Sequence, residues 1–302
     1  MTTSARTPAS VDPRTSEGLA HVLDVTRAAV RDAAALVVRG FRHAKTIEHK
    51  GAVDLVTSFD RNSEALLRDR LGSALPFAIV GEEQGGQTDN VAFYVDPIDG
   101  TTNFVHGHPF WCISVGLVLE GQPVLGVVLS PPLGLEWSGW IAASGERRTT
   151  RRSAANAILS KAGAPPSIVE EVCAVSMTAS LDESLLATGF PYDRRTSAEN
   201  NFDAFVAIKQ RCRAIRRCGS AAMDLCLVAD GTYDGYWERK LRPWDIAGGI
   251  ALVHAAGGKV TDFSGGRTSI ESGQVIATNG AIHDVLLDEL ATVSSSQRDI
   301  RG

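Results

Sequence analysis

The chain has 302 residues, of which 44% are hydrophobic and 22% are charged, a balance typical of a globular protein with a sizeable core. Its formal net charge is −5, whereas a protein that coats nucleic acid normally carries a basic excess, so nucleic acid is not an expected partner. The longest apolar stretch, residues 112–129, is interrupted by Glu120, Gly121, Gln122 and Pro123 and therefore predicts no membrane span.

The beginning of the chain is rich in Ser, Thr and Pro and lacks the apolar run of a signal peptide. We therefore expect residues 1–17 to be a disordered leader and the protein to be cytoplasmic. The five cysteines are scattered and form no CxxC pair, so reduced thiols are expected rather than a zinc or redox site.

Periodic apolar residues, turn residues and glycines predict the elements of the N-terminal half. In chain order these are helices over residues 19–41 and 60–71, strands over residues 77–80 and 91–95, and an antiparallel hairpin over residues 112–129. Gly72 stands where the second helix is expected to end. Both strands end abruptly in acidic residues and glycine, which is how active sites are often presented.

A basic cluster and two prolines interrupt the pattern between residues 145 and 166, and we place a domain boundary there, after residue 155. The expected elements beyond it are helices over residues 201–210, 220–229 and 246–256 and strands over residues 259–263 and 274–277. This alternation predicts a layered fold of the α/β or α+β class.

Two carboxylates three residues apart, Asp96 and Asp99, follow the second strand in the segment DPIDGTTNF. The proline and glycine around them predict a turn, in which both side chains converge on one point. Ile98, between them, offers a backbone carbonyl. Mg²⁺ binds carboxylate and carbonyl oxygens and needs no His or Cys, so the pattern favours magnesium over zinc.

Three further acidic residues have ambiguous interpretations. Glu82 and Glu83 follow Gly81 at the end of the strand at residues 77–80, where the strand gives way to a loop. Asp245 stands at the start of the helix at residues 246–256, where aspartate is also a favoured cap. Each is a weak signal when taken singly, and the five acidic residues together predict a metal site.

The segments GEE, DPIDGTTNF and WDIAGGIALVHAAGG, in this order, resemble the signature of the inositol monophosphatase family of lithium-sensitive, metal-dependent phosphatases. The segments at residues 53–60 and 218–245 agree with the same pattern. The resemblance covers nearly the whole chain, but residues 142–178 do not match it, and the match resumes at residues 181–193.

The resemblance implies a site of two or three Mg²⁺ ions. The implied metal ligands are Glu82, Asp96, the Ile98 carbonyl, Asp99 and Asp245, with Asp96 bridging. The implied catalytic residues are Glu82, Thr101 and Asp60, where Thr101 is hydrogen-bonded to Asp60 and orients a metal-activated water for attack on phosphorus. The implied substrate-binding residues are Gly100, Thr101, Thr102, Gly219, Ser220, Ala221, Glu238 and Asp245.

The resemblance also implies a layered sandwich of helices and sheets and a homodimer. Residues 18–155 would form an N-terminal α+β half that carries most metal ligands. Residues 156–302 would form a C-terminal α/β half that carries Asp245 and the substrate-binding residues, with the active site between the halves.

The implied reaction is hydrolysis of a small phosphorylated polyol, myo-inositol 1-phosphate or a close relative, to the alcohol and phosphate. Alternative substrates within the fold are histidinol phosphate, fructose 1,6-bisphosphate and 3′-phosphoadenosine nucleotides. Two alternatives of another class remain. One is a regulatory binding partner in an RNA or transcription complex that uses Arg216 and Arg217, and the other is a metal sensor without turnover.

Overall fold

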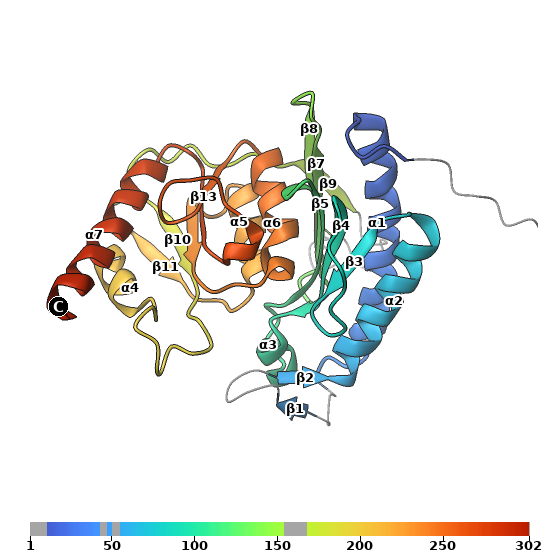
Figure 1. The fold of residues 1–302 in the computed structure, drawn as a ribbon, viewed down its shortest axis with the longest axis horizontal. Coiled ribbons are helices and arrows are strands. Elements are labelled where there is room, and N and C mark those ends of the chain that lie inside the picture. Colours follow the sequence, from blue (N-terminus) through green and yellow to red (C-terminus); the bar gives the residue numbers. More distant parts are fainter. Residues whose placement is uncertain (1–10, 43–46, 50–54, 154–167, 302) are drawn as a thin grey trace, which may run out of the picture.

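The computed structural model describes residues 11–42, 47–49, 55–153 and 168–301. Within these ranges the chain forms alternating layers of helix and sheet (Figure 1), and the predicted layered fold is confirmed. Residues 1–10 of the expected leader and the expected boundary after residue 155 lie outside the described residues. None of the described helices has the length and apolar character that crossing a membrane needs.

Two helices form the first layer. They are α1 (Ser16–Val37) and α2 (Ser58–Ala74). Helix α1 begins after Thr15, whose hydroxyl accepts a hydrogen bond from Gly18 N at 3.0 Å, a typical N-cap. Helix α2 continues through Gly72, the residue at which the sequence predicted its end, and Leu71 before Gly72 and Leu75 after it are both buried in the core.

A seven-stranded sheet forms the second layer, in the order β3-β4-β5-β6-β7-β8-β9. Its strands are β3 (Ala78–Gly81), β4 (Val91–Asp99), β5 (Cys112–Leu119), β6 (Gln122–Ser130), β7 (Leu135–Ile141), β8 (Arg147–Ser153) and β9 (Val169–Val172). The predicted hairpin is confirmed as β5 and β6, which pair antiparallel. The basic cluster forms β8, and β9 pairs with it, so this sheet includes residues on both sides of the expected boundary.

Helices α5 (Ala221–Ala229) and α6 (Pro243–Ala255) lie between this sheet and a five-stranded sheet (Figure 1). The second sheet has the order β11-β10-β12-β14-β13. Its strands are β10 (Leu185–Thr188), β11 (Ala214–Arg216), β12 (Gly235–Glu238), β13 (Lys259–Thr261) and β14 (Val275–Thr278). Helices α4 (Phe202–Lys209) and α7 (His283–Arg301) cover its far face. The remaining elements are β1 (Ile47–His49), β2 (Leu55–Thr57), α3 (Thr101–His106) and η1 (Ile270–Ser272).

Three apolar clusters hold the layers together. One lies between α1, α2 and the seven-stranded sheet and includes Leu19, Leu67 and Phe93. The largest surrounds α5 and α6, and the third lies under α4 and α7. Burial of apolar surface contributes about 25 cal/mol per Å², so these clusters are the main source of stability and fix where the ends of the strands lie.

The chain departs from the prediction at the end of β4. We expected Asp96 and Asp99 to lie in a turn, but β4 continues through both, with Asp96 opposite Ser114 and Asp99 opposite Cys112. The register shifts between these two pairs, as in a β-bulge, and Pro97 lies in that irregular stretch, where a missing N–H costs no ladder bond. The chain turns one residue later, at Gly100, whose φ is +95°.

Candidate active site

The bulged end of β4, an internal strand of the seven-stranded sheet, carries two aspartates that lie close to each other. Asp96 is only 2% exposed and Asp99 8% exposed. The Ile98 N–H donates to Oδ1 of Asp96 at 2.9 Å and fixes that carboxylate. Gly100 then takes the left-handed backbone conformation that starts α3, which is why glycine suits this position.

Asp99 is held by the C-terminal half of the chain. Its Oδ2 accepts hydrogen bonds from the Ser220 hydroxyl and from the Ala222 N–H, both at 2.7 Å. Ser220 is the N-cap of α5, so the start of that helix binds the carboxylate, in line with its partial positive charge. Asn103 adds a second link, since its amide donates to Phe110 O at 2.6 Å and Cys218 O at 2.8 Å.

Asp245 is the third residue of α6, which begins earlier than the sequence predicted. Its Oδ2 accepts a hydrogen bond from the Arg242 N–H at 2.8 Å, so it caps the helix. The same side chain belongs to the acidic group of the site. Burial raises the pKa of Asp245 well above its ordinary value, and the nearby charges of Asp99 and Glu82 raise it further.

The acidic side chains interact unfavourably in the absence of a cation. Burial is the largest cause that raises the pKa of Asp96 well above its usual range, followed by the charges of Glu82, Asp99 and Asp245. Burial also raises the pKa of Asp99 to about 6, although the hydrogen bond from Ser220 opposes it. Crowded, buried carboxylates of this kind are characteristic of functional sites.

The oxygen-rich donor set fits a hard divalent cation such as Mg²⁺. Among the described residues, no three His, Cys, Asp or Glu side chains already surround a single point. Each aspartate is anchored through one carboxylate oxygen, Oδ1 in Asp96 and Oδ2 in Asp99 and Asp245. The other oxygen of each carboxylate is the one that a cation would bind.

Thr101 and Asp60 form a pair beside this acidic group, as the sequence predicted. The Thr101 hydroxyl lies 3.2 Å from Oδ1 of Asp60 and 3.0 Å from the Ile98 carbonyl oxygen. Oδ2 of Asp60 accepts bonds from the N–H of Thr57 at 2.7 Å and from its hydroxyl at 2.6 Å. Burial raises the pKa of Asp60, against these hydrogen bonds, which favour the charged carboxylate.

Glu238 defines a second part of the site, at the end of β12. The Tyr236 hydroxyl donates to its Oε2 at 2.6 Å. Burial raises the pKa of Glu238 to about 7, although the bond from Tyr236 and the charge of Arg217 oppose the shift. A Cβ on Gly189 would lie 1.8 Å from Oε2, so glycine is what allows Glu238 to sit against the end of β10.

The remaining expected substrate residues lie around α3 and α5. Gly100 and Gly219 are close, since a Cβ on Gly100 would lie 3.1 Å from the Gly219 carbonyl oxygen. Thr102 is exposed on α3, and Ala221 is buried at the start of α5. The Ser220 hydroxyl, expected at the substrate, binds Asp99 in this structure.

Sequence reasoning missed two residues that support the site, Glu64 and Asn103. Glu64 lies on α2 one helical turn after Asp60, and it is fully buried. Helical spacing places the two carboxylates on one face, a signal that could have identified it. The link from Asn103 to Cys218 has no local signal, because the two residues are 115 positions apart in the sequence.

Comparisons with known proteins agree with this geometry. The sequence pattern described as the Inositol monophosphatase family matches residues 19–296. The chain is 39% identical over 274 residues to a Synechocystis protein named inositol-1-monophosphatase, covering 89% of this chain and 88% of that one. It is 34% identical over 279 residues to a Pseudomonas aeruginosa protein named Nus factor SuhB, covering 88% and 94%.

A solved inositol monophosphatase from Anabaena (Nostoc) sp. PCC 7120 has the same fold. Its TM-score is 0.72 at 34% identity, covering 91% of this chain and 96% of that one. The family is one of lithium-sensitive, Mg²⁺-dependent phosphoric monoester hydrolases, which agrees with an oxygen-rich acidic site. The chain therefore belongs to the inositol monophosphatase family and is a phosphatase.

Proposed function

We propose that this phosphatase hydrolyses myo-inositol 1-phosphate, or a related inositol monophosphate, to inositol and phosphate. The observation that carries the proposal is the position of Glu238, a half-buried carboxylate near Asp99 and Asp245, where it could contact the alcohol part of a substrate. A carboxylate accepts hydrogen bonds from two neighbouring hydroxyls, which a polyol offers.

The acidic group would hold two or three Mg²⁺ ions through Glu82, Asp96, the Ile98 carbonyl, Asp99 and Asp245. Bound Mg²⁺ supplies the positive charge that attracts a phosphate group into an acidic site and the Lewis acidity that activates water. The protein contributes the fixed positions of the ligands. Asp99 bonds Ser220 and Ala222 of the other half of the chain, so its position depends on the packing of both halves.

Thr101 and Asp60 would orient the attacking water together with Glu82. A hydroxyl has one proton, which Thr101 can donate either to the Ile98 carbonyl or to Asp60. If the Ile98 carbonyl bound a cation, donation to Asp60 would be favoured, and the lone pairs of Thr101 would be free to accept a hydrogen bond from water. The contacts from Thr57 help to keep Asp60 charged for this task.

The alcohol would lie between Glu238 and the start of α5. Gly219 and Ala221 are small residues, which would suit the approach of a ring. Tyr236 holds Oε2 of Glu238, so Oε1 can face the substrate. Histidinol phosphate, fructose 1,6-bisphosphate and 3′-phosphoadenosine nucleotides are the alternatives. Histidinol phosphate and the nucleotide base offer no adjacent pair of hydroxyls to Glu238 at that position.

A panel of phosphate esters tests the substrate. Phosphate release is measured at saturating Mg²⁺ with inositol 1-phosphate, histidinol phosphate, fructose 1,6-bisphosphate and 3′-phosphoadenosine 5′-phosphate. We expect kcat/KM to be highest for inositol 1-phosphate and Li⁺ to inhibit. If kcat/KM were higher for another ester, that ester would become the proposed substrate in place of inositol 1-phosphate. The homodimer implied by the sequence remains a prediction, which light scattering of the purified protein tests.

A second function has support of its own in the Pseudomonas relative named Nus factor SuhB. Arg213, Arg216 and Arg217 are exposed around β11 and offer a basic surface to a partner in an RNA or transcription complex. Capture of such a complex that depends on Arg216 and Arg217 and not on Asp99 would support this role. The acidic site described above favours catalysis as the main function.

A further inference from the structure

The loop that carries Glu82 is unusually well anchored through its backbone. Gly81 and Gly85 pair across it, with Gly81 N to Gly85 O at 2.9 Å and Gly85 N to Gly81 O at 3.0 Å. The Glu82 N–H donates to Val95 O at 3.2 Å, directly before Asp96. The next two amides, those of Glu83 and Gln84, both donate to the side chain of Glu64.

Glu64 acts on this loop from α2. Its Oε2 accepts the Glu83 N–H at 2.6 Å, and its Oε1 accepts the Gln84 N–H at 3.1 Å. The side chain is fully buried and is held by Arg68, whose Nε donates to Oε1 at 2.8 Å. Hydrogen bonds to an ionised acceptor are roughly twice as strong as neutral ones, so one carboxylate fixes two consecutive peptide groups.

Arg68 extends the same arrangement to both sides of the loop. Its guanidinium donates to the carbonyl of Ile79, in β3, at 3.0 Å and also to the carbonyl of Gly85. Glu64 lies so close to the chain that a Cβ on Gly81 would be 2.3 Å from its Oε1. Only glycine at position 81 leaves room for the Glu64 side chain to approach the loop this closely.

We propose that Glu64, supported by Arg68, is a positioning residue for Glu82. It holds the peptide groups that follow Glu82 and so sets the direction in which that side chain leaves the loop. The role rests on the proposed assignment of Glu82 as a metal ligand. Glu64 itself contacts backbone amides and Arg68, and its effect on catalysis is transmitted through the loop.

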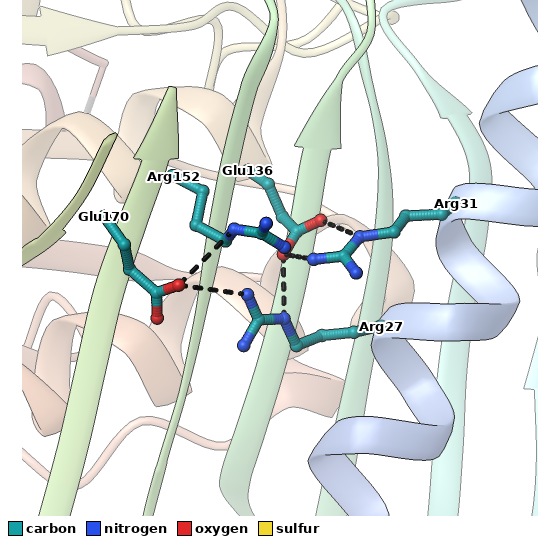
Figure 2. Close-up of polar contacts among 5 residues, drawn as sticks. All are labelled: Arg27, Arg31, Glu136, Arg152 and Glu170. Atoms are coloured by element: carbon teal, nitrogen blue, oxygen red, sulfur yellow. Dashed lines mark hydrogen bonds and ion pairs between the residues drawn. The ribbon is translucent and has the colours of Figure 1, made fainter. Parts of the chain in front are cut away.

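The variant Glu64→Gln tests this role, because an amide has one acceptor oxygen and cannot accept from both loop amides and Arg68. Glu136→Gln is the matched control. Glu136 is also a buried carboxylate held by arginines, Arg27 at 2.8 Å and Arg31 at 2.6 Å (Figure 2). It lies on β7, four strands from β3, or about 19 Å at the usual strand spacing.

The first measurement is amide hydrogen exchange of the metal-free protein. We expect the peptide that contains residues 82–85 to exchange at least about tenfold faster in Glu64→Gln and to be unchanged in Glu136→Gln. The second is the Mg²⁺ concentration for half-maximal phosphate release, which should rise about 10- to 100-fold with little change in the substrate KM. Arg68→Lys should shift both in the same direction and less, which keeps the test valid if Glu64→Gln does not fold.

Unchanged exchange in the loop, or a Mg²⁺ dependence equal to that of Glu136→Gln, would overturn the role of Glu64. The exchange measurement needs no metal and no substrate. Failure of the proposed function would therefore appear separately, as a wild-type protein without Mg²⁺-dependent phosphate release from inositol 1-phosphate.

Discussion

The hydroxyl of Ser220 donates a hydrogen bond of 2.7 Å to Oδ2 of Asp99, which joins residues 121 positions apart in the chain. Ser220 begins α5 between the two sheets, and Asp99 ends β4 in the first of them. The contact therefore couples the packing of the two halves to the geometry of the acidic group. It also opposes the rise in the pKa of Asp99 that burial causes.

Ser220→Ala should destabilise the protein by about 1.5–3 kcal/mol, because it removes a hydrogen bond to a buried charged group and the cap of α5. Denaturant unfolding of the metal-free protein measures the change. Ser220→Thr keeps the hydroxyl and is the control. Equal stability of the Ala and Thr variants would show that the hydroxyl contributes nothing.

Asp96→Asn should make the metal-free protein more stable, by about 0.5–2 kcal/mol, while phosphate release is lost. The reason is that burial and three nearby carboxylates raise the pKa of Asp96, so its charge is unfavourable in the folded state. Asparagine keeps the acceptor oxygen for the Ile98 N–H. Thermal unfolding in a chelator gives the comparison, and a less stable variant would contradict the prediction.

The same cause predicts how pH acts on the metal-free wild type. A carboxyl group whose pKa is raised in the folded state binds protons more readily when the protein is folded. The destabilisation caused by its buried charge therefore decreases as the pH falls through that pKa. For Asp99 the window runs from about 6 down to the ordinary value of 3.8. Relative to Asp99→Asn, the wild type should gain stability across this window. If the stabilities of the wild type and Asp99→Asn changed with pH in parallel, a raised pKa of Asp99 would be ruled out.

His283 should lower the stability of the folded protein as the pH falls, opposite to the effect of Asp99. It is fully buried between the hydroxyls of Thr261 and Thr278, each at 2.9 Å, and burial lowers its pKa from 6.5 to about 4. The neutral ring is favoured in the folded state, so its contribution is complete above pH 6.5 and is lost as pH falls toward 4. The loss is about 3 kcal/mol.

The measurement is the stability difference between the wild type and His283→Asn as a function of pH. It should shrink between pH 6.5 and 4. His21→Asn, at an exposed position on α1, is the control and should leave the curve unchanged. A difference that is constant over this range would contradict the assignment.

Thr101→Val should lower kcat about 100-fold or more with little change in Tm, since it removes the hydroxyl that would orient water but keeps the shape of the side chain. Asp60→Asn should lower both kcat and Tm, because Asp60 also caps α2 through Thr57. Steady-state kinetics beside thermal unfolding separates the two variants. Nearly full activity of Thr101→Val would remove it from the catalytic group.

Glu238→Gln should raise KM for inositol 1-phosphate about tenfold and leave KM for a phosphate ester without vicinal hydroxyls nearly unchanged. The variant weakens charge-assisted hydrogen bonds to the alcohol and does not touch the phosphate side. Steady-state kinetics of the wild type and the variant with both esters gives the change in KM for each ester. An equal effect on both would assign Glu238 to the support of the metal ligands.

Local patterns predicted much of the fold, and contacts distant in sequence explain the rest. The apolar stripe of α1 and the glycine turn of the hairpin at Gly121 are local signals, and both elements were confirmed. The continuation of β4 through Pro97 was missed because it depends on pairing with β5. The Asp96 and Asp99 pair was visible because both carboxylates lie within four residues.

The basic residues within residues 142–178, which do not match the family pattern, also make contacts that are distant in sequence. From the sequence alone, we placed a domain boundary in the region that begins with the basic cluster of Arg147, Arg148, Arg151 and Arg152. In the structure Arg152 pairs with Glu170, and Arg151 with Asp230, across β9 and the end of α5. Such ion pairs cannot be inferred from one segment, because each partner lies elsewhere in the chain.

The carboxylates at the end of β4 are proposed to bind Mg²⁺ for hydrolysis of inositol 1-phosphate. The experiment that separates this proposal from its alternatives is a Mg²⁺ titration of phosphate release from this ester, with the wild type beside Asp99→Asn. We expect phosphate release that rises with Mg²⁺ in the wild type and is absent in the variant at every Mg²⁺ concentration. Release that needs no Mg²⁺, or that survives in Asp99→Asn, would contradict the proposal.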